Sequence, residues 1–301
     1  MQDQIDKLYA DIKAVNVQGA TNVALATLEG MQLTVDQGGP GVLEKIELVG
    51  VRLSTARKNE PLARNAVRYV LEKLKNASDN NAIEQARAGI AEFKHIIEQS
   101  KQSIKRHAVE VLMQYNTIFT HCHSSTANSA IIEVFNVNPR LKVIATETRP
   151  LFQGRKTAAK LLEVGVDVTQ IVDSLGAYFI VEDKYLPIEV VIIGADEVLA
   201  DGRCINKVGS YQLALAAKED RDKFFVLASL LKMDFHRQIE DPVIEMRPAE
   251  EVWPEAPDSL KIINPSFELI PSNFVSGYIT EAGLLQASEL TSKAKEIYPW
   301  I

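Results

Sequence analysis

Apolar residues in the first third of the chain recur at the spacing of one helix face. One long stretch starts at Asn81, and its apolar positions are Ile83, Ala86, Ile90, Phe93, Ile97 and Ile104. Another opens with Pro61, which a first helical turn tolerates, and its apolar face carries Leu62, Ala66, Val70 and Leu74. Two more helices are predicted for residues 18–31 and 42–53. Residues 1–114 are therefore predicted to form a helical domain.

From Asn116 onward the pattern changes to short apolar runs that are rich in β-branched residues. The runs are Ile118–Phe119, Val143–Ala145, Thr169–Val172, Val190–Ile193 and Phe224–Leu227. Amphipathic helical stretches separate them, and the tail adds a strand candidate at Tyr278–Ile279 and a closing helix. Strands that alternate with helices form βαβ units, and continuous apolar runs are typical of buried parallel strands. Residues 115–301 are therefore predicted to form a doubly wound, Rossmann-like α/β domain.

Composition and charge narrow the classes of partner. The net charge of -7 argues against a nucleic-acid surface, which needs clustered Lys and Arg. No apolar run approaches the roughly 20 residues of a membrane helix, and the polar N-terminus resembles neither a signal nor a transit peptide. The two cysteines, Cys122 and Cys204, suit a reducing compartment. We therefore expect a cytoplasmic protein whose partner is neither nucleic acid nor membrane.

Polar residues follow the ends of five predicted strands. Ligands of open α/β sheets bind beyond the carboxyl ends of the strands, so these residues are expected to share one edge. They are Thr120–Thr126, then Thr146–Arg149 with Gln153, then Asp173–Ser174, then Asp196–Glu197 with Asn206 and Lys207, and finally Ser229 with Lys232. A small-molecule site at this edge explains the placement better than scattered surface polarity does.

A phosphate cradle is one interpretation of Ser124, Ser125 and Thr126, because they stand where a helix should begin and leave backbone N–H groups open to an anion. The alternative is that they only cap the helix. The cations that could converge on the site are Arg57, Arg149, Lys207 and Lys232. Each alone is more typical of a solvated surface, so the argument depends on their joint placement.

Cys122 has three interpretations. It is a small buried hydrophobe, or a metal ligand together with His121 and His123, or an acid/base thiol whose pKa is lowered by imidazoles and a helix N-terminus. On an extended segment the two imidazoles lie on the opposite face from Cys122, and no CxxC or HExxH motif is present, so we predict no metal and no other cofactor. The place of Cys122 at a strand end beside a cradle favours acid/base chemistry.

Asp196 ends a buried strand, where desolvation raises the pKa of a carboxyl and suits it to proton transfer. The alternative is an N-cap of the following helix. Cys204 has no acid/base neighbour in its loop and is interpreted as structural.

Four ordered strings give the chain a specific resemblance. They are THCHS (Thr120–Ser124), ETRPxxQG (Glu147–Gly154), GADEV with DG (Gly194–Gly202) and NKVG (Asn206–Gly209). Together with TARKNEPLARNAVRYV in the helical half and with NPSFELIP and ITEAG in the tail, they resemble one superfamily over nearly the whole chain. It comprises ribose-1,5-bisphosphate isomerase, methylthioribose-1-phosphate isomerase and the regulatory-type subunits of the eukaryotic initiation-factor guanine-nucleotide exchange complex.

The resemblance implies a helical domain on a Rossmann-like domain, assembled as homodimers or as a hexamer built of dimers. It implies that Cys122 is the proton acceptor and Asp196 the proton donor. The implied substrate contacts are Gly19, Ala20, Thr21, Arg57, Ser124, Ser125, Thr126, Asn206, Lys207 and Lys232, to which Arg149 and Gln153 are added from their strand ends.

Three branches of the superfamily compete. Retention of both Cys122 and Asp196 favours an enzyme over the noncatalytic subunits, and the chain carries VQGATNVA where methylthioribose-1-phosphate isomerases have an RGAPAIG-like string. Lys232 favours a second phosphate over a methylthio group, so conversion of ribose-1,5-bisphosphate to ribulose-1,5-bisphosphate is the first choice. Gln18 departs from the Arg of that branch and cannot pair with phosphate as a charged fork. Arg155 and Lys58 are the candidates to replace its charge.

Overall fold

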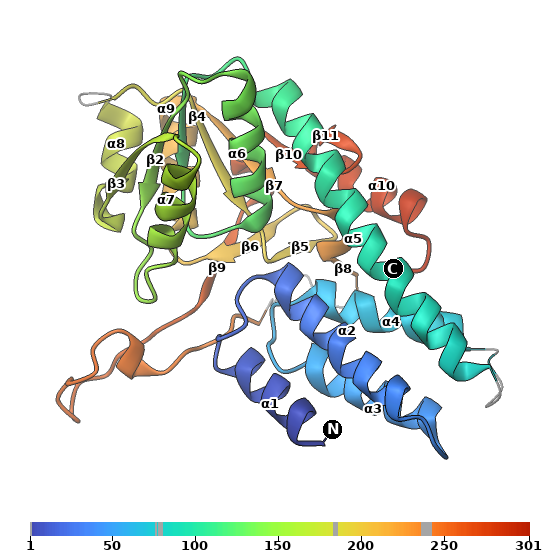
Figure 1. Ribbon diagram of the computed structural model, residues 1–301. Helices are drawn as coiled ribbons and strands as arrows, with labels where there is room; N and C mark the ends of the chain where they lie inside the picture. Colours follow the sequence, from blue (N-terminus) through green and yellow to red (C-terminus); the bar gives the residue numbers. More distant parts are fainter. Residues whose placement is uncertain (1, 76, 78–80, 183–185, 236–242) are drawn as a thin grey trace.

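The first part of the chain is helical, as the apolar spacing predicts. The computed structural model describes residues 2–75, 77, 81–182, 186–235 and 243–301. The helices of this part are α1 (Gln2–Lys13), α2 (Ala20–Gln37), α3 (Val42–Ser54), α4 (Pro61–Leu74) and α5 (Ala82–Leu112). They lie against one edge of an α/β part (Figure 1). No helix in the described ranges is long and apolar enough to cross a membrane.

Helix α5 belongs to both parts. It has 31 residues, which makes it about 46 Å long. Its N-terminal half, from Ala82 to Ile97, packs in the core of the helical part, whereas Ile104, Ala108 and Leu112 pack against the sheet. Figure 1 shows it running diagonally from one part to the other. A division into domains between residues 114 and 115 therefore stays a prediction.

The main sheet has seven strands in the order β11-β10-β7-β4-β1-β2-β3. Its strands are β1 (Thr117–Thr120), β2 (Lys142–Thr146), β3 (Asp167–Ile171), β4 (Val190–Gly194), β7 (Lys223–Leu227), β10 (Gly277–Thr280) and β11 (Gly283–Leu285). All pairings are parallel except that of β10 with β11. The chain winds from β1 outward to β3 and then returns to β4 on the other side of β1. The expected doubly wound α/β fold is confirmed, and its direction reverses between β1 and β4, where such sheets bind ligands.

Successive residues of a strand face opposite sides of the sheet, which explains why the strands are apolar throughout. In β4, Val190 and Ile192 pack into one core, and Val191 and Ile193 pack into the other. One face is covered by α5, α6 (Ser125–Val137) and α7 (Gln153–Glu163), and the other by α8 (Gly176–Glu182) and α9 (Ser210–Asp220). The closing helix, α10 (Leu290–Ile297), contacts the turn before β8.

A second, four-stranded sheet lies between the main sheet and the helical part (Figure 1). Its strands, in spatial order, are β8 (Met233–Asp234), β5 (Glu197–Leu199), β6 (Cys204–Lys207) and β9 (Phe267–Ile270). The sequence does not predict this sheet, because its strands have only two to four residues and too few positions for a period to show. Lys207 is the last residue of β6 and lies near the carboxyl ends of the main-sheet strands β1 and β4. Cys204 is buried in β6, in line with the structural role expected of it.

Candidate active site

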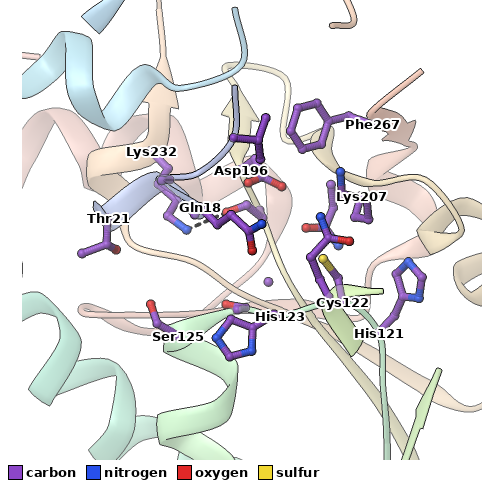
Figure 2. A pocket seen from close by; sticks show the side chains of 18 of the residues that line it. Gln18, Thr21, His121, Cys122, His123, Ser125, Asp196, Lys207, Lys232 and Phe267 are labelled. Atoms are coloured by element: carbon purple, nitrogen blue, oxygen red, sulfur yellow. Dashed lines mark hydrogen bonds between the residues drawn. The ribbon is translucent and has the colours of Figure 1, made fainter. Parts of the chain in front are cut away.

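A cavity opens where β1 and β4 end and the helical part meets the sheet. Most of the residues expected to bind or react line it, namely Gln18, Gly19, Ala20, Thr21, Arg57, Cys122, Ser124, Ser125, Gln153, Asp196, Asn206, Lys207 and Lys232. Figure 2 shows Cys122 and Asp196 near its centre, Lys232 and Thr21 on one side, and Lys207 and Phe267 on the other. Segments more than 200 residues apart in sequence therefore contribute to one site.

Two of the expected residues do not line this cavity. Arg149 is exposed, and its Nη2 donates to Val252 O at 2.8 Å. Its backbone N–H donates to Asp173 Oδ2 at 2.6 Å, and its side chain is not among the residues that line the cavity. The buried side chain of Thr126 lies in a smaller neighbouring cavity, together with Thr21 and Lys232.

Close packing explains the glycine before Ala195 in the GAD string. A Cβ on Gly194 would lie 2.5 Å from Ser124 Oγ, so only glycine lets the end of β4 approach the start of α6. Ser124 Oγ accepts the N–H of Ala127 at 3.2 Å, so the capping interpretation of this side chain is confirmed. Ser124 therefore both caps α6 and lines the cavity.

Two helix N-termini meet at the cavity. Helix α6 begins at Ser125, and α2 begins at Ala20 after Gly19, whose φ of 85° is easy only for glycine. Neither first turn has intrahelical partners for its leading N–H groups, and both helix dipoles place partial positive charge there. The arrangement suits a phosphate or another small anion.

The thiol of Cys122 is less acidic than the sequence suggests. Desolvation raises the pKa of Cys122 to about 11, although the nearby Lys207 ammonium acts in the opposite direction. The prediction that imidazoles lower this pKa is wrong, because burial lowers the pKa of His121 to about 4 and leaves its ring neutral. The two ring nitrogens of His121 face Thr146 Oγ1 at 2.5 Å and Val208 O at 2.9 Å.

Desolvation raises the pKa of Asp196, while Lys232, Lys207 and Arg57 hold it down. The residue stands between β4 and β5 and precedes no helix, so the N-cap interpretation is wrong. Asn206, turned so that both of its amide atoms are bonded, donates to Asp196 Oδ2 at 3.3 Å. The Lys232 ammonium donates to Ala195 O at 2.6 Å and so lies directly behind the carboxyl.

Arg57 lies in the cavity wall between two buried glutamate side chains. Its Nη1 contacts Glu60 Oε1 at 2.8 Å, and its Nε contacts Glu245 Oε2 at 3.0 Å. The guanidinium lies 5.6 Å from the centre of the Phe267 ring, and the Lys207 ammonium lies 4.7 Å from the same ring. The sequence does not indicate Phe267 or Glu245, since contacts between distant segments bring them here. Glu60 lies only three residues after Arg57, and the sequence analysis does not single it out.

The charge near Gln18 comes from an unexpected residue. Lys156, on α7, donates to Gln18 Oε1 at 2.7 Å. Neither expected substitute does this, because Arg155 pairs with Glu147 at 2.8 Å and Lys58 lines a separate surface depression. Helical spacing offers a partial signal, since Lys156 lies three residues after Gln153, which lines the cavity.

Among the residues that the structure describes, no group of three or more His, Cys, Asp or Glu side chains is arranged to hold a metal ion. His121 and His123 have different hydrogen-bond partners. His123 Nδ1 faces Thr157 Oγ1 at 3.0 Å, on the α7 side of the cavity.

Comparison with known proteins places this arrangement in a family. The family model described as the initiation factor 2 subunit family matches residues 16–287. The chain belongs to this family. The match covers both the helical part and the sheet, so it includes every residue of the cavity except Val15.

Characterised relatives of the family include two kinds of isomerase. Ribose 1,5-bisphosphate isomerase of Archaeoglobus fulgidus is 33% identical over 91% of this chain and 87% of its own length. The isomerase of the same name from Methanocaldococcus jannaschii is 32% identical over 99% of this chain and 97% of its own length. Methylthioribose-1-phosphate isomerase of Geobacter sulfurreducens is 29% identical over 94% and 89%, respectively.

Solved structures share the fold. Translation initiation factor eIF-2B of Pyrococcus horikoshii OT3 superposes with a TM-score of 0.82 at 24% identity, covering 94% of this chain and 96% of that one. The 5-methylthioribose 1-phosphate isomerase of the same organism has a TM-score of 0.79, also at 24% identity, over 97% and 88%. At these identities the likeness shows the architecture alone.

Proposed function

We infer that this protein is a sugar-phosphate isomerase and propose that it converts ribose-1,5-bisphosphate to ribulose-1,5-bisphosphate. The observation that carries the proposal is the placement of Cys122 and Asp196 in one cavity, between two helix N-termini and three buried cations. The names of the relatives that match nearly the whole chain support the same reaction class. None of the catalytic groups needs a cofactor in this scheme.

Two separated sources of positive charge support a substrate with two phosphates. Lys232 and the start of α2 lie on one side of the cavity, and Lys207 lies on the other (Figure 2). Both ammonium groups are buried, so each gains more from an anionic ligand than a solvated lysine would. We propose that one phosphate binds at each side and that the ribose lies between them.

The Cys122/Asp196 pair can hold a single proton between its two groups. Burial raises the pKa of Asp196 and raises that of Cys122 to about 11. A pair that carries one proton is either thiol with carboxylate or thiolate with carboxylic acid. These two forms have the same charge and differ only in where the proton resides. We propose that the second form is the reactive one, because isomerisation needs an acid and a base at once.

The proposed reaction opens the sugar ring and then moves a proton from carbon 2 to carbon 1. The carbon-1 phosphate keeps the sugar ring closed, so Asp196 first donates its proton to the ring oxygen as the bond from that oxygen to carbon 1 breaks. Cys122 then removes the proton of carbon 2, which leaves an enediol phosphate. The Cys122 thiol returns a proton to carbon 1, and the carbon-2 hydroxyl gives its proton to Asp196 as the ketone forms. Acid and base each contribute roughly 10²–10⁴-fold to such reactions.

Gln153 offers a specific contact for the sugar. Its side chain is buried at the start of α7 and lines the cavity, yet its Oε1 has no hydrogen-bond partner within the described chain. A buried acceptor without a donor is costly, and a ligand hydroxyl can satisfy it. We propose that Gln153 Oε1 accepts a hydrogen bond from a ribose hydroxyl.

Methylthioribose-1-phosphate isomerase is the second candidate, because relatives of that name also match most of the chain. Its methylthio group requires an apolar wall. Phe267 is the aromatic ring of the cavity, but Arg57 and Lys207 lie over it, which suits an anion better. A noncatalytic regulatory subunit is the remaining alternative, and the family name alone favours it.

A substrate comparison tests the proposal. We expect turnover of ribose-1,5-bisphosphate at a kcat/KM at least roughly tenfold above that of 5-methylthioribose 1-phosphate, because one buried charged hydrogen bond is worth about 1.5–3 kcal/mol. Lys232→Gln should lower kcat/KM for the bisphosphate more than for the monophosphate, and the exposed Lys94→Gln serves as the matched control. Preference for the methylthio sugar would establish the second candidate. Binding of both sugars without turnover would establish the regulatory one.

We also propose that the protein forms homo-oligomers. Its relatives by structure include a tetrameric complex of initiation-factor subunits, although that likeness shows only the fold. The apolar side chains of Trp253, Leu260 and Ile263 are each at least 48% exposed on a segment that projects from the body (Figure 1). A second copy of the chain is the occupant we propose for this segment.

A further inference from the structure

Asp173 connects the end of β3 to the loop that follows β2. Its carboxylate accepts two consecutive backbone N–H groups, from Thr148 at 2.7 Å and from Arg149 at 2.6 Å. Asp173 does not line the cavity, so it does not contact a ligand there. Both oxygens are used as acceptors of charge-assisted hydrogen bonds, which only a carboxylate can provide at this position.

Thr148 passes this restraint to the candidate base. Its backbone has a φ of 62°, a left-handed conformation that β-branched residues avoid, and its side chain is fully buried. In this conformation Thr148 Oγ1 accepts the backbone N–H of Cys122 at 3.0 Å. The two hydrogen bonds from Asp173 therefore hold a strained residue whose hydroxyl binds the reactive one.

Cys122 is itself held in a left-handed conformation, with a φ of 68°. Its N–H is bound by Thr148, and its carbonyl accepts the Thr157 hydroxyl at 2.8 Å. Gly154 closes the loop from the other side, since a Cβ there would lie 1.8 Å from Thr146 O. Strained backbone persists only where its surroundings impose it, and it gathers at functional sites. Here the direction of the thiol depends on these few contacts.

We propose that Asp173 and Thr148 are positioning residues for the isomerisation, acting in series to fix the backbone of Cys122 so that its thiol faces the cavity. The inference rests on the proposed function, in which Cys122 is the base. Neither residue touches the substrate. Their effect is on the orientation of the thiol and hence on the chemical step, with little effect on substrate binding.

Asp173 also acts on Cys122 through its charge. The charged and titratable groups that face the thiol are Lys207, which lowers its pKa, and Asp196 and Asp173, which raise it; the neutral rings of His121 and His123 flank it. Replacing the Asp173 carboxylate by a neutral amide removes one of the two negative charges. The thiol should therefore ionise at lower pH in Asp173→Asn, whereas loss of the Thr148 hydroxyl alone removes no charge.

The test uses four variants: Asp173→Asn, Thr148→Val, Thr148→Ser and, as a matched amide control, Asp167→Asn at the exposed start of β3. The first readout is the rate at which iodoacetamide alkylates Cys122 as a function of pH, with Cys122→Ser as the blank for the buried Cys204. We expect the pH midpoint to fall in Asp173→Asn and to stay at the wild-type value in Asp167→Asn.

The second readout is steady-state kinetics with ribose-1,5-bisphosphate. Asp173→Asn and Thr148→Val should lower kcat roughly 10- to 100-fold with KM little changed, and Thr148→Ser, which keeps the hydroxyl, should restore kcat. Wild-type alkylation profiles and wild-type kcat in both Asp173→Asn and Thr148→Val would overturn the proposal. If the wild type does not turn over the sugar, the limiting alkylation rate above the midpoint decides the positioning role. A lower limiting rate in both Asp173→Asn and Thr148→Val, with the wild-type rate in Thr148→Ser, would uphold that role while the proposed function fails, and unchanged rates would overturn both. Should Asp173→Asn not fold, the Thr148→Val and Thr148→Ser pair decides through kcat.

Discussion

At the scale of single residues, burial acts in opposite ways on the groups of the cavity. It raises the pKa of Cys122 and of Asp196, and it lowers the pKa of His121 and of Lys232. The imidazole of His121 is therefore a fixed hydrogen-bonding group and no proton carrier. The same burial acts on Cys122 and Asp196 together, which the proposed mechanism uses as one acid/base pair.

This pair predicts a bell-shaped dependence of kcat/KM on pH. Below the pKa of Asp196 both groups are protonated and no base is available, so the rate falls as the pH falls. Above the pKa of Cys122, about 11, both groups have lost their protons and no acid is available, so the rate falls as the pH rises. A pH–rate profile over the range in which the protein stays folded checks this. A decline between pH 7 and 9 would contradict the account of the thiol.

Glu60 predicts a pH dependence of stability. Burial raises its pKa from 4.5 to about 8 despite the nearby Arg57. Between pH 4.5 and about 8, the folded protein therefore holds a proton on Glu60 that the unfolded chain releases. The free energy of unfolding falls as the pH rises through this range. The slope is about 1.4 kcal/mol per pH unit for one such group.

Urea unfolding of the wild type and of Glu60→Gln at pH 5 and pH 8 measures this contribution. The variant cannot ionise at residue 60, so its stability should change less between the two pH values. Asp167→Asn is a suitable control, since this carboxyl is exposed. An equal pH dependence in wild type and Glu60→Gln would show that Glu60 is ionised in the folded protein throughout.

At the scale of elements, the cavity depends on how closely β4 and α6 approach. Gly194→Ala places a Cβ within 2.6 Å of both Cβ and Oγ of Ser124, and this serine caps α6. We expect a loss of stability of about 1–3 kcal/mol, typical of overpacking, together with loss of turnover. Thermal unfolding and the isomerase assay measure the two effects.

Gly89→Ala on α5 is the matched control for that change. A Cβ there meets Lys73 at an ordinary distance of 3.5 Å, and alanine favours a helix by up to about 1 kcal/mol over glycine. Gly89→Ala should therefore keep or gain stability and keep activity. Equal losses in the two variants would mean that the contact with Ser124 is not the cause.

The elements differ in how far the sequence predicts them. The long helices and the six parallel strands of the main sheet follow from periodicity and from apolar runs, because each has enough residues to show a pattern. The second sheet does not, since β8 has two residues and β5 has three. Phe267 and Lys207 both reach the cavity through this sheet. Lys207 stands in the NKVG string and is predicted, whereas Phe267 stands in the NPSFELIP string, which is used only for the resemblance.

The sequence predicts most of the residues that line the candidate site, but it does not predict their contacts or their burial. The strand-end rule and the ordered strings indicate most of the residues that line the cavity. They do not indicate the carboxylates around Arg57, the contact of Lys156 with Gln18, or the desolvation that raises the pKa of Cys122. Apart from the local contact of Arg57 with Glu60, each depends on contacts between segments distant in sequence. Arg149 is expected at the site for its charge, but its guanidinium donates to Val252 O outside the cavity.

At the scale of the whole molecule, a net charge of -7 surrounds a cavity that gathers Arg57, Lys207 and Lys232. The helical part supplies Arg57 and the start of α2, and the sheet supplies the two lysines, with α5 packed in the cores of both parts. The site therefore exists only where the two parts meet. Either part alone would lack half of the anion contacts.

The projecting segment predicts the assembly state. If Trp253, Leu260 and Ile263 are covered by a second copy, light scattering should give a mass that is a multiple of the chain mass at micromolar concentration. A double variant, Trp253→Asp with Ile263→Asp, should lower that mass, because each change places a charge in an apolar contact. A monomeric wild type would contradict the proposed assembly. The exposed Leu48→Asp on α3 is the control.

The most direct test of the central claim is the reaction of ribose-1,5-bisphosphate in deuterium oxide, followed by NMR, with the wild type and Cys122→Ser side by side. We predict ribulose-1,5-bisphosphate that carries solvent deuterium at carbon 1, and a rate at least roughly 100-fold lower in the variant, because its hydroxyl is a far weaker acid/base than a thiol. Full turnover by Cys122→Ser would contradict the role of Cys122 as the base, and a ketose in which the carbon-2 hydrogen has moved to carbon 1 with no deuterium would favour a hydride shift over the enediol.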